Sequence, residues 1–171
     1  MFDHQNLYPQ QQVTTQPLVA LLNDVMPKAI ETDIVIFHWL DFDCQCTYLG
    51  RLFVEQLTRQ QLAADVKHII LLPPDANSDE NIKSSFNLPD NVHVTRLNQS
   101  LYRQSQSLIP ATPGAAILRQ STQSLSYLGP HSGGVACGSG TNLIELVVNN
   151  LAHGFDPQLY QLQSSGCFCS W

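Results

Sequence analysis

The amino-acid sequence predicts an α/β protein of the three-layer α/β/α kind, in which helices cover both faces of a central mixed sheet. Two continuous apolar runs, residues 33–39 and 66–72, predict strands that are buried on both faces. A helical pattern between them implies parallel neighbours joined by a right-handed crossover. Two later strands flank a short polar turn and predict a hairpin, which adds antiparallel strands to the sheet.

Length and composition are those of one globular domain. The 171 residues suffice for one sizeable core, 43% of them are hydrophobic and 13% are charged, and the net charge is −6. The eight basic residues are scattered, which argues against nucleic acid as a partner, because a phosphate backbone requires a clustered positive face. We expect a polar arm or linker at 1–16, the folded domain at 17–155 and a cysteine-containing tail at 156–171 that packs on it.

The first half of the chain alternates between helices and strands. Residues 17–30 carry apolar side chains at helical spacing, and strand 33–39 follows. The next helix is predicted by apolar residues that recur at steps of three and four, namely Leu49, Leu52, Phe53 and Leu57. Strand 66–72 ends at two prolines, which cannot donate to a sheet.

The second half supplies the remaining strands and the clearest helix. Residues 77–87 suggest a short helix, and 91–97 alternate like a strand with one solvated face. Residues 115–119 and 125–128 form the predicted hairpin. Helix 142–154 begins with Asn142 and Glu145, which resemble a capping box, and ends at Gly154, where a C-terminal cap belongs.

Cys44 and Cys46 lie one residue apart between the first predicted strand and the helix that follows it. A helix N-terminus offers unpaired amides and the positive end of its dipole, so a thiolate at Cys44 is favoured there. The neighbouring Asp43 opposes this effect through its like charge unless its side chain points away. The plainer interpretation is a pair of small buried side chains at the start of a helix.

The order of motifs resembles the thioredoxin-like superfamily over about residues 30 to 155. The resemblance is carried by an aromatic strand end with a cysteine pair, "FHWLDFDCQC", by Thr112 and Pro113 ahead of a strand, and by the hairpin and last helix. An extra strand and a long connection are more similar to bacterial periplasmic or membrane-tethered redoxins, here with a DCxC motif. The resemblance implies that Pro113 is cis and that Thr112 presents its backbone to the cysteine pair, where a substrate strand could dock.

The spacing of the cysteines departs from the CxxC motif of that superfamily. Residues two apart on a helix point to nearly opposite sides, so a disulfide between Cys44 and Cys46 is strained or requires the helix to begin late, near Thr47. In the strained case, the pair should be easily reduced and act as an oxidant or isomerase.

The other three cysteines leave several interpretations open. Cys137 could bridge to Cys167 or Cys169 as a structural clamp, or the tail pair could exchange with Cys44 or Cys46 as a relay. Thiolates also select copper(I) or zinc, so a set of Cys44, Cys46 and His131 could carry a metal. His38, within an apolar run, is more simply a core histidine whose polar atoms are satisfied.

We therefore predict a thiol-disulfide oxidoreductase with Cys44 as nucleophile and Cys46 as resolving thiol, while Thr112 and Pro113 shape the site. Protein thiols or disulfides are the expected partners, and no cofactor is expected. The glycine-rich stretch at 129–140 lacks the lysine and spacing of a nucleotide loop, and no GxSxG elbow supports a hydrolase. The alternatives are a copper or zinc carrier and a redox-inactive interaction domain.

A composition rich in Gln and Ser and poor in Lys favours an extracytoplasmic location, either periplasmic or tethered to a membrane through a segment absent from this chain. The first residues lack the pattern of a signal peptide, and no apolar run reaches membrane-spanning length.

Overall fold

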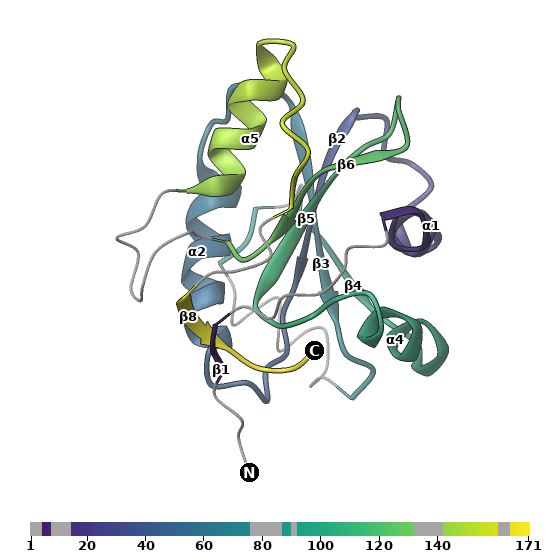
Figure 1. Ribbon diagram of the computed structural model, residues 1–171, viewed down its shortest axis with the longest axis vertical. Helices are drawn as coiled ribbons and strands as arrows, with labels where there is room; N and C mark the ends of the chain where they lie inside the picture. Colours follow the sequence, from purple (N-terminus) through teal and green to yellow (C-terminus); the bar gives the residue numbers. More distant parts are fainter. Residues whose placement is uncertain (1–4, 8–14, 76–86, 90–91, 132–141, 161–164) are drawn as a thin grey trace.

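The computed structural model describes residues 5–7, 15–75, 87–89, 92–131, 142–160 and 165–171. Their architecture confirms the predicted three-layer, thioredoxin-like α/β/α fold around a mixed sheet (Figure 1). None of the helices in these ranges is both long and apolar enough to span a bilayer.

The central sheet has six strands in the order β4-β3-β2-β5-β6-β7. The parallel part consists of β2 (Ile34–Trp39), β3 (Val66–Leu72) and β4 (Val92–Arg96). The predicted hairpin is formed by β5 (Gly114–Arg119) and β6 (Ser124–Gly129), and β5 runs antiparallel to β2. The short β7 (Leu159–Tyr160) closes the edge parallel to β6.

Two helices cover each face of the sheet (Figure 1). One face carries α1 (Thr15–Val25) and α4 (Gln99–Gln106), and the other carries α2 (Thr47–Arg59) and α5 (Leu143–Ala152). Strand β2 is buried along its whole length because its side chains alternate between the two apolar clusters under these layers. Trp39 belongs to the cluster under α1 and α4, and Ile36 to the cluster under α2 and α5.

The ends of the elements show which local signals were correct. Asn142 caps α5 by accepting a hydrogen bond from the backbone N–H of Glu145, and Gly154 has a φ of +82°, as a C-terminal cap requires. Helix α4 was not predicted, and its one clear signal is Asn98, which accepts from the N–H of Leu101. The helix predicted at 77–87 lies almost entirely outside the described residues.

A second, two-stranded sheet joins the two ends of the chain. Strand β1 (Gln5–Leu7), within the predicted arm, pairs antiparallel with β8 (Ser165–Phe168) in the tail. Figure 1 places this small sheet beside the N-terminal end of α2. The tail is thereby brought to the end of the central sheet that carries the cysteine pair.

Candidate functional site

Cys44 and Cys46 lie in a tight turn between β2 and α2. The N–H of Cys44 donates to the carbonyl of Asp41 at 3.1 Å, and the N–H of Thr47 donates to the carbonyl of Cys44 at 3.0 Å. The helix begins at Thr47 with Cys46 as its N-cap residue. Cys44 therefore precedes the helix instead of occupying its first turn; the helix begins at Thr47, the late start that was predicted for an unstrained disulfide between Cys44 and Cys46.

Asp41 organises this turn. Its carbonyl also accepts the hydroxyl of Thr47, and its carboxylate accepts the N–H of Asp43 at 2.9 Å. Burial raises the pKa of the Asp41 carboxyl, and the hydrogen bond from Asp43 opposes that rise. The turn is thus held by main-chain and side-chain contacts that do not involve the sulfur atoms.

The loop before β5 lies against this turn. The Thr112–Pro113 peptide bond is cis. The Thr112 hydroxyl donates to the Trp39 carbonyl at 3.1 Å and accepts the N–H of Asp41 at 3.3 Å. The indole N–H of Trp39 donates to the carbonyl of Ala111 at 2.6 Å. Because β5 is antiparallel to β2, the loop that precedes β5 and the cysteine turn that follows β2 meet at the same end of these two central strands.

Helix α2 packs directly on this loop at a glycine. A Cβ added at Gly50 would lie 2.5 Å from Pro113 Cβ, far below ordinary contact distance. The proline ring cannot rotate away as a long side chain could. The absence of a side chain at Gly50 therefore lets the start of α2, with its cysteines, approach Thr112 and Pro113.

Both cysteines of the turn are bonded to the tail. Disulfides join Cys44 to Cys169 and Cys46 to Cys167, with Cα–Cα distances of 6.0 and 5.3 Å. These pairings replace the disulfide predicted between Cys44 and Cys46. They also exclude, in this state, the predicted clamp from Cys137 to a tail cysteine; Cys137 itself lies outside the described residues.

The tail pairs with the Thr112 backbone through an isolated antiparallel bridge at Cys169. The N–H of Thr112 donates to the carbonyl of Cys169, and the N–H of Cys169 donates to the carbonyl of Thr112, both at 2.9 Å. Cys44 Sγ lies 4.0 Å from the Thr112 carbonyl oxygen. The tail thus satisfies both backbone groups of the residue that the resemblance assigns to substrate docking.

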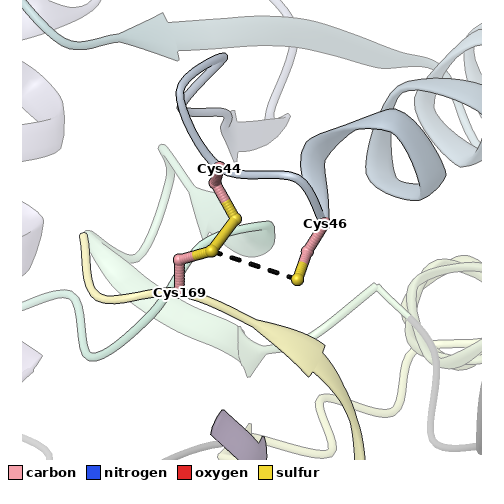
Figure 2. Close-up of side chains that lie close together, drawn as sticks. All are labelled: Cys44, Cys46 and Cys169. Carbon is pink, nitrogen blue, oxygen red and sulfur yellow. Dashed lines mark hydrogen bonds between the residues drawn. A yellow bond between two sulfur atoms is a disulfide. The ribbon is translucent and has the colours of Figure 1, made fainter. Parts of the chain in front are cut away.

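The sulfur atoms form one compact group. Figure 2 shows Cys46 Sγ facing the Cys44–Cys169 disulfide, with 3.9 Å between Cys46 Sγ and Cys169 Sγ. This is a contact between disulfide sulfurs, neither of which carries a proton. The Cys44, Cys46 and Cys169 sulfurs all lie within 4.8 Å of one another, and His131 is not part of this group.

Two aromatic side chains anchor the tail. Phe168 is buried against Ala111. The indole N–H of Trp171 donates to the Ser105 hydroxyl at 2.7 Å, and its ring meets that of Tyr102 edge to face at 5.4 Å. Trp171 is only 5% exposed and belongs to the core cluster under α1 and α4. The tail is therefore packed as well as bonded.

Three buried histidines form a hydrogen-bonded chain under α2. His38 Nδ1 lies 3.0 Å from His131 Nε2, and His38 Nε2 lies 3.0 Å from His68 Nδ1. The ring of His131 also packs on Phe53 of α2, with 5.1 Å between centroids. The polar atoms of His38 are satisfied in the core as predicted. The role of His68 was missed, although it occupies an apolar run as His38 does.

Burial keeps these rings neutral. It lowers the pKa of His68 to about 4 and that of His131 to about 3; it also lowers the pKa of His38 well below 6.5, with a further contribution from the two neighbouring imidazoles. Within the described part of the chain, His131 Nδ1 has no hydrogen-bond partner. Since an orphaned N–H is rarer than an orphaned acceptor, we assign the proton of His131 to Nε2, which donates to His38.

Comparison with solved structures places the fold among uncharacterised proteins. A conserved protein from Geobacillus kaustophilus aligns with a TM-score of 0.62 and 15% identity, over 99% of this chain and 92% of that one. A hypothetical protein from Sinorhizobium meliloti 1021 aligns with a TM-score of 0.58 and 13% identity, over 100% and 98% of the two chains. A thioredoxin-like protein from Aeropyrum pernix gives a TM-score of 0.49 at 13% identity, covering 69% and 76%.

No protein of curated function matches the sequence. Residues 10–171, which include the cysteine turn, the Thr112–Pro113 loop and the tail, match one family as a unit. The chain therefore belongs to the family described as a domain of unknown function, DUF6436.

Proposed function

We propose that the protein is a thiol-disulfide oxidoreductase that acts on protein thiols or disulfides through the CxC pair. The observation that carries the proposal is the bond from Cys44 to Cys169, a residue held on the Thr112 backbone by two hydrogen bonds. A mixed disulfide with an extended peptide would have this arrangement. The site can therefore bind peptide backbone and hold a cysteine of that peptide at Cys44.

The two cysteines of the turn take different roles in this proposal. The Cys44 thiolate attacks one sulfur of a substrate disulfide, which forms a mixed disulfide and releases the other sulfur as a thiolate. The Cys46 thiolate then attacks Cys44 Sγ, which gives a Cys44–Cys46 disulfide and releases the second substrate thiolate. Protons from the two enzyme thiols end on the two substrate thiols. The positive end of α2 stabilises the attacking thiolate.

An oxidising compartment suits this chemistry. Disulfides persist in the periplasm and at cell surfaces and are rare in the cytosol. We accordingly propose an extracytoplasmic location, as for bacterial redoxins that are periplasmic or membrane-tethered. Thr112 and Pro113 would shape the site, and the expected partners are proteins rather than nucleotides or nucleic acids.

A set of cysteine variants tests the assignment of Cys44. Both tail cysteines are first replaced by serine, so that the Cys44 and Cys46 thiols alone remain in the site. In that background, adding Cys44→Ser should abolish reduction of a disulfide-linked peptide, because the attacking sulfur is gone. Adding Cys46→Ser should instead trap the peptide on Cys44, since the resolving thiol is missing. Intact-mass analysis without reductant detects the trapped species.

Two outcomes would contradict the proposal. Full activity of the Cys44→Ser chain would mean that the nucleophile lies elsewhere. If the chain that lacks only the two tail cysteines fails to reduce the peptide disulfide, the redox-inactive interaction domain is favoured.

The sulfur group favours one second candidate, a carrier of copper(I) or zinc. Three sulfurs within 4.8 Å of one another could bind such an ion once they are reduced to thiolates. This set uses Cys169 in place of His131, whose Nε2 lies 3.0 Å from His38.

Metal analysis of one preparation in two redox states separates the candidates. The oxidised chain is expected to hold no stoichiometric copper or zinc, because a disulfide sulfur is not a thiolate. One-to-one copper(I) binding by the reduced chain that is lost in Cys169→Ser but retained in His131→Gln would favour the carrier. Weak copper(I) binding by the reduced wild-type chain would instead favour the oxidoreductase.

A further inference from the structure

We propose that the segment Ser165–Trp171 is an internal peptide that occupies the dithiol site, and that its two cysteines give the chain a capacity of four electrons. This inference rests on the proposed oxidoreductase function and deepens it. A site that uses Cys44 and Cys46 alone would store two electrons. The structure brings four sulfurs together instead.

The tail and an external peptide cannot use the site together. Thr112 has one N–H and one carbonyl facing the tail, and both are engaged with Cys169. A substrate strand paired with Thr112 would need the same two groups. In the oxidised chain Cys44 is 5% exposed and Cys46 is 1% exposed, so neither sulfur is open to a protein substrate. Substrate access therefore requires release of the tail.

Reduction provides that release. Two equivalents of a dithiol supply four electrons and four protons, break Cys44–Cys169 and Cys46–Cys167, and leave as two disulfides. Among the described residues, the tail keeps the Thr112 pairing, the pairing with β1, the packing of Phe168 and Trp171, and the hydrogen bond from the Gln106 side chain to the Trp171 carbonyl. These contacts are non-covalent, so an external peptide can compete with them.

The four thiols can then reduce two substrate disulfides in sequence. The first turnover leaves a Cys44–Cys46 disulfide and two substrate thiols. The Cys169 thiolate attacks Cys46 Sγ, its neighbour at 3.9 Å in the closed state, and expels the Cys44 thiolate. The tail, now bonded to Cys46 alone, unpairs from Thr112, so that Cys44 can attack a second substrate disulfide and release one substrate thiol.

Return of the tail completes the sequence. The Cys167 thiolate attacks Cys46 Sγ and frees Cys169, and Cys169 attacks Cys44 Sγ and expels the last substrate thiol. The two disulfides of the structure are restored. Four protein thiols have been oxidised, and four substrate thiols have been formed with the four protons.

The test counts substrate thiols released by a known amount of enzyme. Fully reduced protein, freed of reductant, is mixed with an excess of a cysteine peptide dimer, and free peptide thiol is measured by mass spectrometry after alkylation. Wild type should release four thiols per chain, and the Cys167→Ser/Cys169→Ser chain should release two. Cys137→Ser is the matched control and should release four.

A wild-type plateau at two thiols, with Cys167 and Cys169 still open to alkylation, would overturn the four-electron centre. So would a loss of two thiols in Cys137→Ser. Release of no thiol by any chain, including the chain without tail cysteines, would instead contradict the oxidoreductase function.

Tail release is also measurable without activity. Trp171 is buried in the oxidised state, so full reduction in the presence of a competing peptide, whose cysteine is replaced by serine, should shift its fluorescence to longer wavelength, and Trp171→Phe should remove that shift. Unchanged wild-type emission on full reduction in the presence of a serine-substituted peptide would show that the tail does not leave the site.

Discussion

Lowering the pH from 7 to 5 is expected to reduce the free energy of unfolding by about 4 kcal/mol through two buried histidines alone. In the unfolded chain their pKa is 6.5, whereas in the folded chain it is about 4 for His68 and about 3 for His131. Between these values the unfolded chain binds more protons. The stabilisation is complete above pH 6.5 and is lost as the pH falls towards the folded values. His38 acts in the same direction.

Urea unfolding of the oxidised chain at several pH values measures this loss. His131→Gln keeps an amide that can donate to His38 but removes one titration, so its loss between pH 7 and 5 should be smaller by about 2 kcal/mol. His93→Gln, an exposed histidine of β4, is the control and should follow wild type. If His131→Gln also follows wild type, the ring of His131 is not held neutral by the fold.

The two disulfides are expected to stabilise the chain in a strongly non-additive way. They span 125 and 121 residues, so whichever forms first closes a long loop, worth about 5 kcal/mol by the chain-entropy relation. The other then closes only a small ring between neighbouring residues, worth about 2 kcal/mol. Removing either pair should therefore cost about 2 kcal/mol, and removing both should cost about 7 kcal/mol.

Four chains test this expectation by urea unfolding: wild type, Cys44→Ser/Cys169→Ser, Cys46→Ser/Cys167→Ser and the quadruple variant. Each is measured with and without reductant, because the difference isolates the cross-link from the effect of serine itself. Two single-pair losses that add up to the loss in the quadruple variant would show that the cross-links act independently.

The sheet and most helices could be predicted because their sequence signals are local. Residues 34–39 are apolar at every position except His38 because β2 is covered on both faces, and the cap at Asn142 is complete within four residues. Helix α4 was missed because its sequence is largely polar, and its apolar contacts with the core are made by two residues, Leu101 and Tyr102. Its role is to receive Trp171, which lies far away in the sequence.

The candidate site could be predicted only in part, for a similar reason. The residues Cys44, Cys46, Thr112 and Pro113 were predicted together from the order of motifs, and the structure brings them to one edge of the sheet. The sulfur pairing depends on how the tail docks on Thr112, and no local pattern encodes a contact between residues so far apart. The histidine chain likewise joins three strand or loop positions that become neighbours only in the folded sheet.

The small sheet ties the N-terminal side of the chain to the cysteine-containing tail. Among the described strands, β8 is the sole partner of β1, and β8 carries Cys167. In the proposed cycle, a tail that leaves Thr112 either carries β1 with it or unpairs from it. Either way, the β1–β8 pairing couples the position of residues 5–7 to the oxidation state of the cysteines.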